Sequence, residues 1–136
     1  MIRPLRIEGL HGLEMDSTSP NRTVLYLADL DAYAEAEDTV FPLYLSEADF
    51  RESERFRTRT LQQRFLASRY LLKRVLADLV DRPADRLQIA HTQSGKPFIP
   101  NAGFTFNLSH SKNRFAIGIS VEGEIGVDIE LGLSME

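Results

Sequence analysis

The sequence predicts an α+β fold in which one long helix packs on a small, mainly antiparallel sheet. Apolar side chains between Leu61 and Leu79 recur at steps of three, four and seven, which is typical of a helix with one buried face. Further along the chain, three short apolar runs alternate with turn residues, which is typical of antiparallel strands. These runs are Phe106–Ser111, Phe115–Val121 and Ile125–Glu130.

Length and composition limit the class of protein. The chain has 136 residues, 43% of them hydrophobic, a formal net charge of −4 and no cysteine. A single domain of this length buries roughly two-thirds of its unfolded surface. We expect a loose lead-in over residues 1–21 and a single α+β lobe over residues 22–136. The charge argues against nucleic acid as a partner. With no apolar run of membrane-spanning length and no signal-peptide core, we expect a cytoplasmic protein that does not bind membranes.

The first half of the predicted lobe contains one strand and most of the helical signal. Thr23–Leu27 is β-branched and apolar enough for a strand, and Asp29–Glu37 is typical of a short helix or a loop. Ser46 resembles a helix N-cap with an acidic residue, Asp49, at the third helical position, although the strict capping box has Glu or Gln there. From this cap we expect helix to about Leu79. Its buried face comprises Leu61, Phe65, Leu72, Val75, Leu76 and Leu79.

After the helix, which Pro83 is expected to end, a short strand over Leu87–Ile89 leads into a turn over Gln93–Pro97. Glycine at position 95 lets the backbone approach a ligand closely, and Lys96 supplies a positive charge. Taken alone, this segment is equally typical of an ordinary surface turn.

Positive charge is concentrated in the predicted helix. Eight basic residues lie between Arg51 and Arg74, against two acidic ones, Glu52 and Glu54. A charged helix face is usually only solvated. Arginine also binds phosphate oxygens through its planar fork, so a phosphate-binding surface is the alternative interpretation. The basic residues are Arg51, Arg55, Arg57, Arg59, Arg64, Arg69, Lys73 and Arg74.

Two carboxylates alternate with aliphatic residues in the last apolar run. Asp128 and Glu130 are separated by Ile129, so on a strand they project from the same face. Adjacent anionic groups repel each other unless a cation lies between them, and Mg²⁺ is typically held by one or two carboxylates together with substrate phosphates. The alternative is a strand with a solvated outer face.

Three motifs together resemble a known family. Ser94-Gly-Lys-Pro97, Phe106-Asn-Leu-Ser-His-Ser111 and Gly126-Val-Asp-Ile-Glu130 occur in the order and at the spacing of the N-terminal half of large-class (Sfp-type) 4′-phosphopantetheinyl transferases. The resemblance covers roughly residues 43–130. It implies one lobe of the two-lobed fold of that family, and Mg²⁺-dependent transfer of the 4′-phosphopantetheine arm of coenzyme A to a serine of an acyl or peptidyl carrier protein.

The resemblance also implies roles for individual residues. Coenzyme A would be contacted by Arg64, Lys96, Pro97, Ser109 and His110, and Mg²⁺ by Asp128 and Glu130. Arg64 matches the arginine that the family uses on the nucleotide phosphate, and Ser109 and His110 resemble the pair that contacts the 3′-phosphate. Asp49 and Glu52 fall where well-known members carry lysines, so Arg51 or Arg55 would have to take their place. A Ser-His-Asp triad built on His110 is the competing idea, but no nucleophile elbow surrounds either serine.

The family's second half supplies a Trp-x-x-Lys-Glu-like motif with a third metal-binding glutamate, and the 136 residues contain no tryptophan. We therefore assign no catalytic residue with assurance to this chain, and we expect it to self-associate or to pair with a second lobe. The apolar strands Phe104–Leu108 and Phe115–Val121 would supply the interface. The alternative function is a non-catalytic module that binds coenzyme A or a carrier protein.

Overall fold

The computed structural model describes residues 9–15, 23–36, 39–80, 87–100 and 103–120. The chain divides into two compact units. We call them the β unit, which comprises Met1–Ala28 and Gln88–Glu136, and the helical unit, which comprises Asp29–Leu87.

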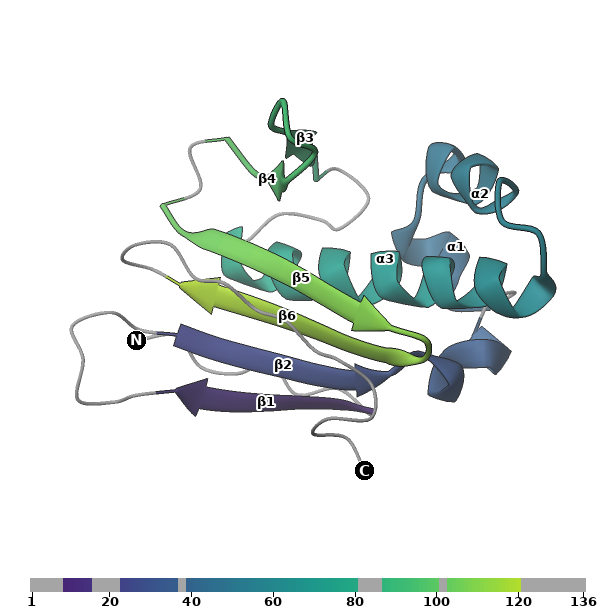
Figure 1. Cartoon of the computed structure of the whole chain (residues 1–136), viewed down its shortest axis with the longest axis horizontal. Coiled ribbons are helices and arrows are strands. Elements are labelled where there is room, and N and C mark those ends of the chain that lie inside the picture. Colours follow the sequence, from purple (N-terminus) through teal and green to yellow (C-terminus); the bar gives the residue numbers. More distant parts are fainter. Residues whose placement is uncertain (1–8, 16–22, 37–38, 81–86, 101–102, 121–136) are drawn as a thin grey trace. The chain divides into compact units, whose positions relative to one another are not determined.

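The β unit is built on a four-stranded sheet with the strand order β1-β2-β6-β5 (Figure 1). The strands are β1 (Leu10–Met15), β2 (Thr23–Asp29), β5 (Thr105–Ser111) and β6 (Arg114–Ser120). β1 pairs with β2 and β5 with β6, both antiparallel. A second, two-stranded sheet consists of β3 (Ala90–His91) and β4 (Pro97–Phe98), and β4 contacts β5.

The predicted third strand, Ile125–Glu130, lies outside the described residues. The predicted hairpin of Phe106–Ser111 with Phe115–Val121 is confirmed up to Ser120. In its register Phe106 pairs with Ile119 and Leu108 with Ile117, so these apolar side chains share one face. The strands are joined at the pair formed by Ser111 and Arg114. The loop residue Lys112 adopts a left-handed backbone with φ of 53°, which suits the twist of a tight hairpin.

Two expectations for the β unit need correction. Residues 1–21 are not loose throughout, because Leu10–Met15 forms β1 along the whole length of the predicted strand at Thr23. The strands expected to offer an exposed apolar interface also differ from the prediction. Phe106, Ile117 and Ile119 are at most 2% exposed, and Phe104 and Leu108 are half-buried, so these strands present no open apolar face.

The helical unit consists of a long helix and three short ones that contact it. They are the 3₁₀-helix η1 (Leu30–Ala36), α1 (Phe41–Tyr44), α2 (Glu47–Ser53) and α3 (Arg59–Val80). Tyr70 of α3 is the centre of an aromatic cluster. Its ring centroid lies 5.9 Å from that of Tyr33, 5.2 Å from Phe41 and 5.3 Å from Tyr44. Aromatic packing thus fixes η1 and α1 on the long helix.

The helical region begins as predicted but is not continuous. Ser46 and Asp49 form a full capping box, with Asp49 in the place of the usual glutamate. The helix then ends at Ser53, and α3 starts anew after Thr58, whose hydroxyl accepts a hydrogen bond from the Leu61 backbone N–H at 3.1 Å. The expected helix is thus interrupted, because Thr58 acts as the N-cap of a separate helix, α3, and satisfies a free backbone N–H of its first turn.

The buried face of α3 includes three residues of the predicted stripe, whereas Phe65 and Leu79 are only half-buried. Leu72, Val75 and Leu76 are at most 2% exposed. Leu61 was expected to be buried with them, but it lies in the first turn of α3 and is 43% exposed. The predicted α+β class, with one long helix and mainly antiparallel strands, is confirmed. None of the helices that the structure describes is long and apolar enough to span a membrane.

Candidate functional site

The β5 strand lies at the edge of the four-stranded sheet and carries two of the predicted ligand-binding residues. His110 is exposed and pairs with Phe115, whereas Ser109 is half-buried and pairs with Ala116. Successive side chains on a strand point to opposite faces, so Ser109 and His110 do not project to the same side. One ligand can therefore contact both only at the edge of β5 that does not pair with β6.

The turn between β3 and β4 holds the predicted lysine. The Thr92 backbone N–H donates to the Lys96 carbonyl at 2.9 Å, and the Lys96 N–H donates to the Thr92 hydroxyl at 3.1 Å. Gly95 has φ of 91°, in the region that favours glycine. Thr92 thus fixes the backbone of Lys96 from two sides, immediately before Pro97 begins β4. Because β4 contacts β5, the structure brings the strand after Lys96 next to the strand of Ser109 and His110.

Arg64, the predicted contact of the nucleotide phosphate, belongs to the helical unit and already has an acidic partner. Its Nε donates to Asp31 Oδ1 at 2.9 Å and its Nη2 to Asp31 Oδ2 at 3.0 Å. The hydrogen bond from Arg64 lowers the pKa of Asp31, and the same bond raises the pKa of Arg64. No local sequence pattern predicts this pair, because the two residues are 33 positions apart.

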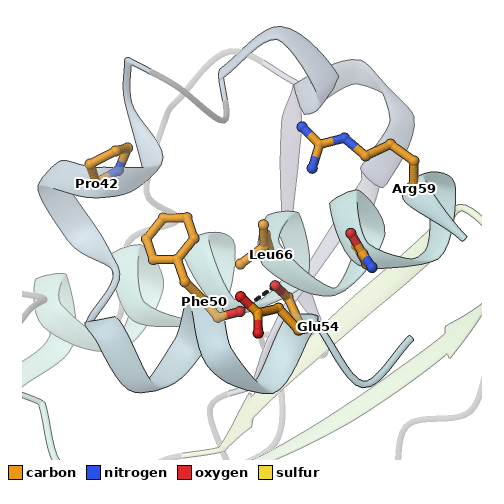
Figure 2. A pocket seen from close by; sticks show the side chains of 7 residues that line it. Pro42, Phe50, Glu54, Arg59 and Leu66 are labelled. Atoms are coloured by element: carbon orange, nitrogen blue, oxygen red, sulfur yellow. Dashed lines mark hydrogen bonds between the residues drawn. The ribbon is translucent and has the colours of Figure 1, made fainter. Parts of the chain in front are cut away.

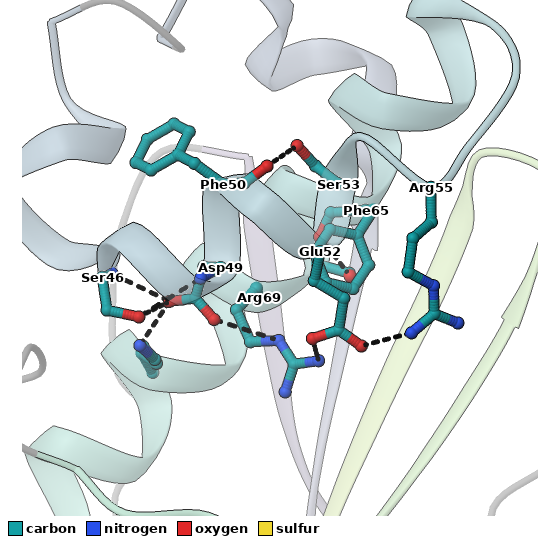
Figure 3. Close-up of polar contacts among 10 residues, drawn as sticks. Ser46, Asp49, Phe50, Glu52, Ser53, Arg55, Phe65 and Arg69 are labelled. Atoms are coloured by element: carbon teal, nitrogen blue, oxygen red, sulfur yellow. Dashed lines mark hydrogen bonds and ion pairs between the residues drawn. The ribbon is translucent and has the colours of Figure 1, made fainter.

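Most other members of the basic cluster are engaged within the helical unit (Figure 3). Asp49 of α2 accepts a short, buried hydrogen bond from Lys73 of α3. Arg69 lies 3.7 Å from Asp49 and 3.8 Å from Glu52, and Arg55 lies 3.6 Å from Glu52. The pairs formed by Lys73 and Arg69 join α2 to α3, whereas the pair of Arg55 with Glu52 is local to the end of α2. Part of the basic cluster thus pairs with acidic residues, and phosphate binding by the remainder stays a prediction.

Asp49 is the centre of this network. Burial would raise the pKa of its carboxyl group, but the hydrogen bonds from Lys73 and from Ser46 outweigh burial and lower it. Asp49 therefore stays ionised while it caps α2 and pairs with α3. The position at which the family's best-known members carry a lysine is occupied here by a carboxylate that holds two helices together.

Arg74 is held in a different way, by aromatic side chains. Its guanidinium group lies 4.9 Å from the ring centroid of Tyr44, and its Nη1 donates to the hydroxyls of Tyr44 and Tyr70, both at 3.2 Å. Arg51 is exposed on α2. Neither Arg51 nor Arg55 is shown to replace the family's lysines, and that substitution stays a prediction.

A pocket of about 430 Å³ opens where α2 ends and α3 begins (Figure 2). Phe50 and Leu66 line it between Pro42 on one side and the charged residues Glu54 and Arg59. Its polar groups are partly satisfied internally: the Ser53 hydroxyl donates to the Phe50 carbonyl at 2.6 Å. The sequence missed this pocket because it results from the unpredicted break between the two helices. None of the predicted ligand-binding residues lines it.

The two predicted metal ligands, Asp128 and Glu130, lie outside the described residues. Within the part of the chain that the structure describes, no three His, Cys, Asp or Glu side chains come together in a group that could hold a metal ion. The metal site accordingly remains a prediction from the sequence.

Comparison with known proteins agrees with the first two motifs and with the fold. The family described as "4′-phosphopantetheinyl transferase, N-terminal" matches residues 36–122. The chain belongs to this family. The match includes the turn with Lys96 and all of β5 and β6.

Individual relatives are consistent with this assignment. The 4′-phosphopantetheinyl transferase AcpT of Escherichia coli O157:H7 is 41% identical over 71 residues, which cover 52% of this chain and 33% of AcpT. The L-aminoadipate-semialdehyde dehydrogenase-phosphopantetheinyl transferase of Xenopus laevis is 33% identical over 70 residues, covering 47% of this chain and 23% of that protein. The chain thus spans about a third or less of the length of these two relatives.

The fold is shared with a holo-(acyl-carrier-protein) synthase from Bacillus anthracis whose crystal structure contains coenzyme A (3′,5′-ADP). The TM-score is 0.55 at 16% sequence identity, and the match covers 72% of this chain and 92% of the synthase. At this identity the likeness supports the fold alone.

Proposed function

We propose that this chain is the coenzyme A-binding, N-terminal part of an enzyme that transfers 4′-phosphopantetheine to a serine of an acyl or peptidyl carrier protein. The carrying observation is that the Ser94-Gly-Lys-Pro97 turn and the Phe106–Ser111 strand are contiguous elements inside the family match. The coenzyme A bound in the Bacillus anthracis synthase is consistent with the same ligand here.

Within the β unit, Lys96, Pro97, Ser109 and His110 are the proposed ligand-binding residues. Thr92 fixes the backbone of Lys96 by hydrogen bonds, so the position from which the lysine side chain extends to bind a phosphate is well defined. His110 is exposed at the edge strand, where its imidazole can donate to a phosphate oxygen. Arg64 of the helical unit is the proposed third cation.

Mg²⁺ is the proposed metal, with Asp128 and Glu130 as its ligands. The predicted strand would place these two carboxylates on the same side, and such a donor set fits a hard cation with oxygen ligands. When bound, the metal would supply neutralisation of the coenzyme A diphosphate.

The chemistry is displacement at phosphorus. A bond forms between the carrier serine oxygen and the β-phosphorus, the bond from that phosphorus to the bridging oxygen breaks, and 3′,5′-ADP leaves with the electron pair. Phosphoryl transfer depends mainly on positioning and on stabilising charge at the phosphate oxygens. Lys96, His110 and Arg64 would hold the nucleotide and its phosphates. The serine proton is assigned to a base outside the described residues.

We propose that the remaining catalytic groups come from a second lobe, and that the reaction takes place in the cytoplasm. The N-terminal designation of the family and the share of each relative that the chain spans support a two-part enzyme. Self-association is the alternative arrangement.

Mass spectrometry of an apo carrier protein tests this function. The carrier is incubated with coenzyme A, Mg²⁺ and this chain, with and without the C-terminal part of the Escherichia coli relative. We expect the carrier to gain one phosphopantetheine group when both parts are present, and none from the C-terminal part alone. Coenzyme A binding without transfer in any mixture would indicate a non-catalytic binding module. Neither binding nor transfer would contradict the proposal.

A further inference from the structure

The Asp31 carboxylate accepts hydrogen bonds from one side of the Arg64 guanidinium group. The two hydrogen bonds, at 2.9 and 3.0 Å, use Nε and Nη2 together, which is the side-on fork of arginine. The Arg64 side chain is 22% exposed and that of Asp31 48%. The pair therefore lies where a ligand from solvent can reach it.

Asp31 is itself held in place by the structure around it. Its backbone N–H donates to Asp29 Oδ1 at 2.9 Å, a local bond that orders the first turn of η1. Leu30, on one side of Asp31, is 2% exposed, and Tyr33 packs its ring against Tyr70 of α3. The carboxylate thus stands on a short helix that is fixed to the helix carrying Arg64, not on a freely moving segment.

The hydrogen bonds to Asp31 leave a second pair of N–H donors of Arg64 available. Arginine carries N–H donors on Nε, Nη1 and Nη2, and Asp31 takes Nε and Nη2 on one side. The N–H groups of Nη1 and the outer N–H of Nη2 remain. Two of them point in parallel away from Asp31, and this end-on pair matches two oxygens of a phosphate. Asp31 is the carboxylate that hydrogen-bonds Arg64, and the negative charge of Asp29 also acts on the guanidinium group.

We propose that Asp31 is a positioning residue: it fixes the Arg64 guanidinium group so that its outer edge binds a terminal phosphate monoester of coenzyme A. This inference rests on the proposed function. A free arginine loses rotamer entropy when it binds, whereas an arginine already held by a carboxylate has lost most of it beforehand. Asp31 thus raises phosphate affinity even though it carries the same charge sign as the ligand.

Calorimetric titration with coenzyme A and with dephospho-coenzyme A, which lacks the 3′-phosphate, tests this role. The informative variant is Asp31→Asn, which keeps the shape but weakens the grip. We expect coenzyme A to bind about fivefold more weakly to this variant, because ordering Arg64 then has to accompany binding. Dephospho-coenzyme A should change by less than about twofold.

Glu35→Gln is the matched control. Glu35 is exposed on the same η1 helix, and its substitution by glutamine removes one negative charge, as Asp31→Asn does. It should leave both affinities unchanged. Arg64→Lys is a second test, since lysine keeps the charge but has no fork to share between a carboxylate and a phosphate. This variant should lose most of the preference for coenzyme A over dephospho-coenzyme A.

Three results would overturn the inference. Equal or tighter binding of coenzyme A by Asp31→Asn would show that Asp31 does not help Arg64. An equal loss for both ligands would show a merely structural role. Absence of coenzyme A binding by the unsubstituted chain would overturn both the proposed function and this inference. In the first two results, by contrast, the unsubstituted chain still binds coenzyme A, so the two failures can be distinguished.

Discussion

The two units of the molecule carry positive charge in opposite ways. The helical unit has many arginines and a lysine close together. Of these, Arg69 and Lys73 pair with acidic side chains, and Arg74 contacts tyrosines. The β unit has few cations near its motifs, yet Lys96 and His110 stand at a turn and at a strand edge without an ion pair in the described residues. A high density of basic residues in a sequence therefore does not by itself indicate that their side chains are available to a ligand.

The difference has a physical origin. A short helix such as α2 has little stability of its own and must be fixed by contacts with a neighbour. Here Asp49 and Glu52 supply those contacts through Lys73 and Arg69 of α3. A turn such as that at Lys96 is fixed by its own backbone hydrogen bonds, so its side chain remains available.

The largest expected effect is on the stability of the helical unit. Asp49→Ala removes the cap of α2 and leaves Lys73 buried without its partner. Breaking a buried ion pair from one side costs about 3–5 kcal/mol in the free energy of unfolding. Denaturant unfolding followed by circular dichroism measures this loss. Arg51→Ala, on the exposed side of the same helix, is the control and should change stability by less than about 0.5 kcal/mol. Similar small effects for both variants would mean that the network does not hold α2 to α3.

A smaller effect is expected on coenzyme A affinity, and it separates the two units. Lys96→Ala removes a charge-assisted contact, so binding should weaken by about 1.5–3 kcal/mol, or tenfold or more. Arg55→Ala removes the same charge from a residue already paired with Glu52 and should weaken binding less than Lys96→Ala does. Calorimetry on both variants makes the comparison. A larger loss for Arg55→Ala would reverse our assignment of the phosphate-binding cations.

Acid should weaken the helical unit through Asp49. Its pKa is lower in the folded protein than the unfolded value of about 3.9, so the ion pair contributes fully above that value. The contribution is lost as the pH falls through the folded pKa. We expect the free energy of unfolding to decrease below about pH 4, with a shallower decrease in Asp49→Ala. The loss should be smaller than that of the substitution, because a protonated carboxyl group can still form hydrogen bonds. Parallel pH profiles for the two proteins would contradict this.

The smallest predicted effect concerns the turn itself. Gly95→Ala meets no neighbouring atom within 4 Å, but the φ of 91° strains any residue with a Cβ. The cost should be about 1 kcal/mol in unfolding free energy. Coenzyme A affinity should fall slightly because Lys96 follows directly. The measurement is a thermal melt paired with one titration, and an unchanged melt would show that the turn relaxes without loss.

Local patterns predicted the structure where local physics decides it. The cap at Ser46, the strand at Thr23 and the hairpin after Phe106 all depend on residues within a few positions of one another, and all three are confirmed. The pairs formed by Asp31 with Arg64 and by Asp49 with Lys73 span 33 and 24 positions, and no periodicity reveals them. Lys96 lies in the predicted turn, and Ser109 and His110 lie on the predicted strand. Their binding roles stay predictions.

The proposed function requires this chain to bind coenzyme A with the help of a metal. The most direct test is a calorimetric titration of the full chain with coenzyme A, once with Mg²⁺ and once with a chelator, repeated for Asp128→Ala. We expect binding that is tighter with Mg²⁺, and a loss of this difference in the variant, because the diphosphate completes the metal's oxygen ligands. Coenzyme A binding that is absent, or present but equal under all these conditions, would contradict it.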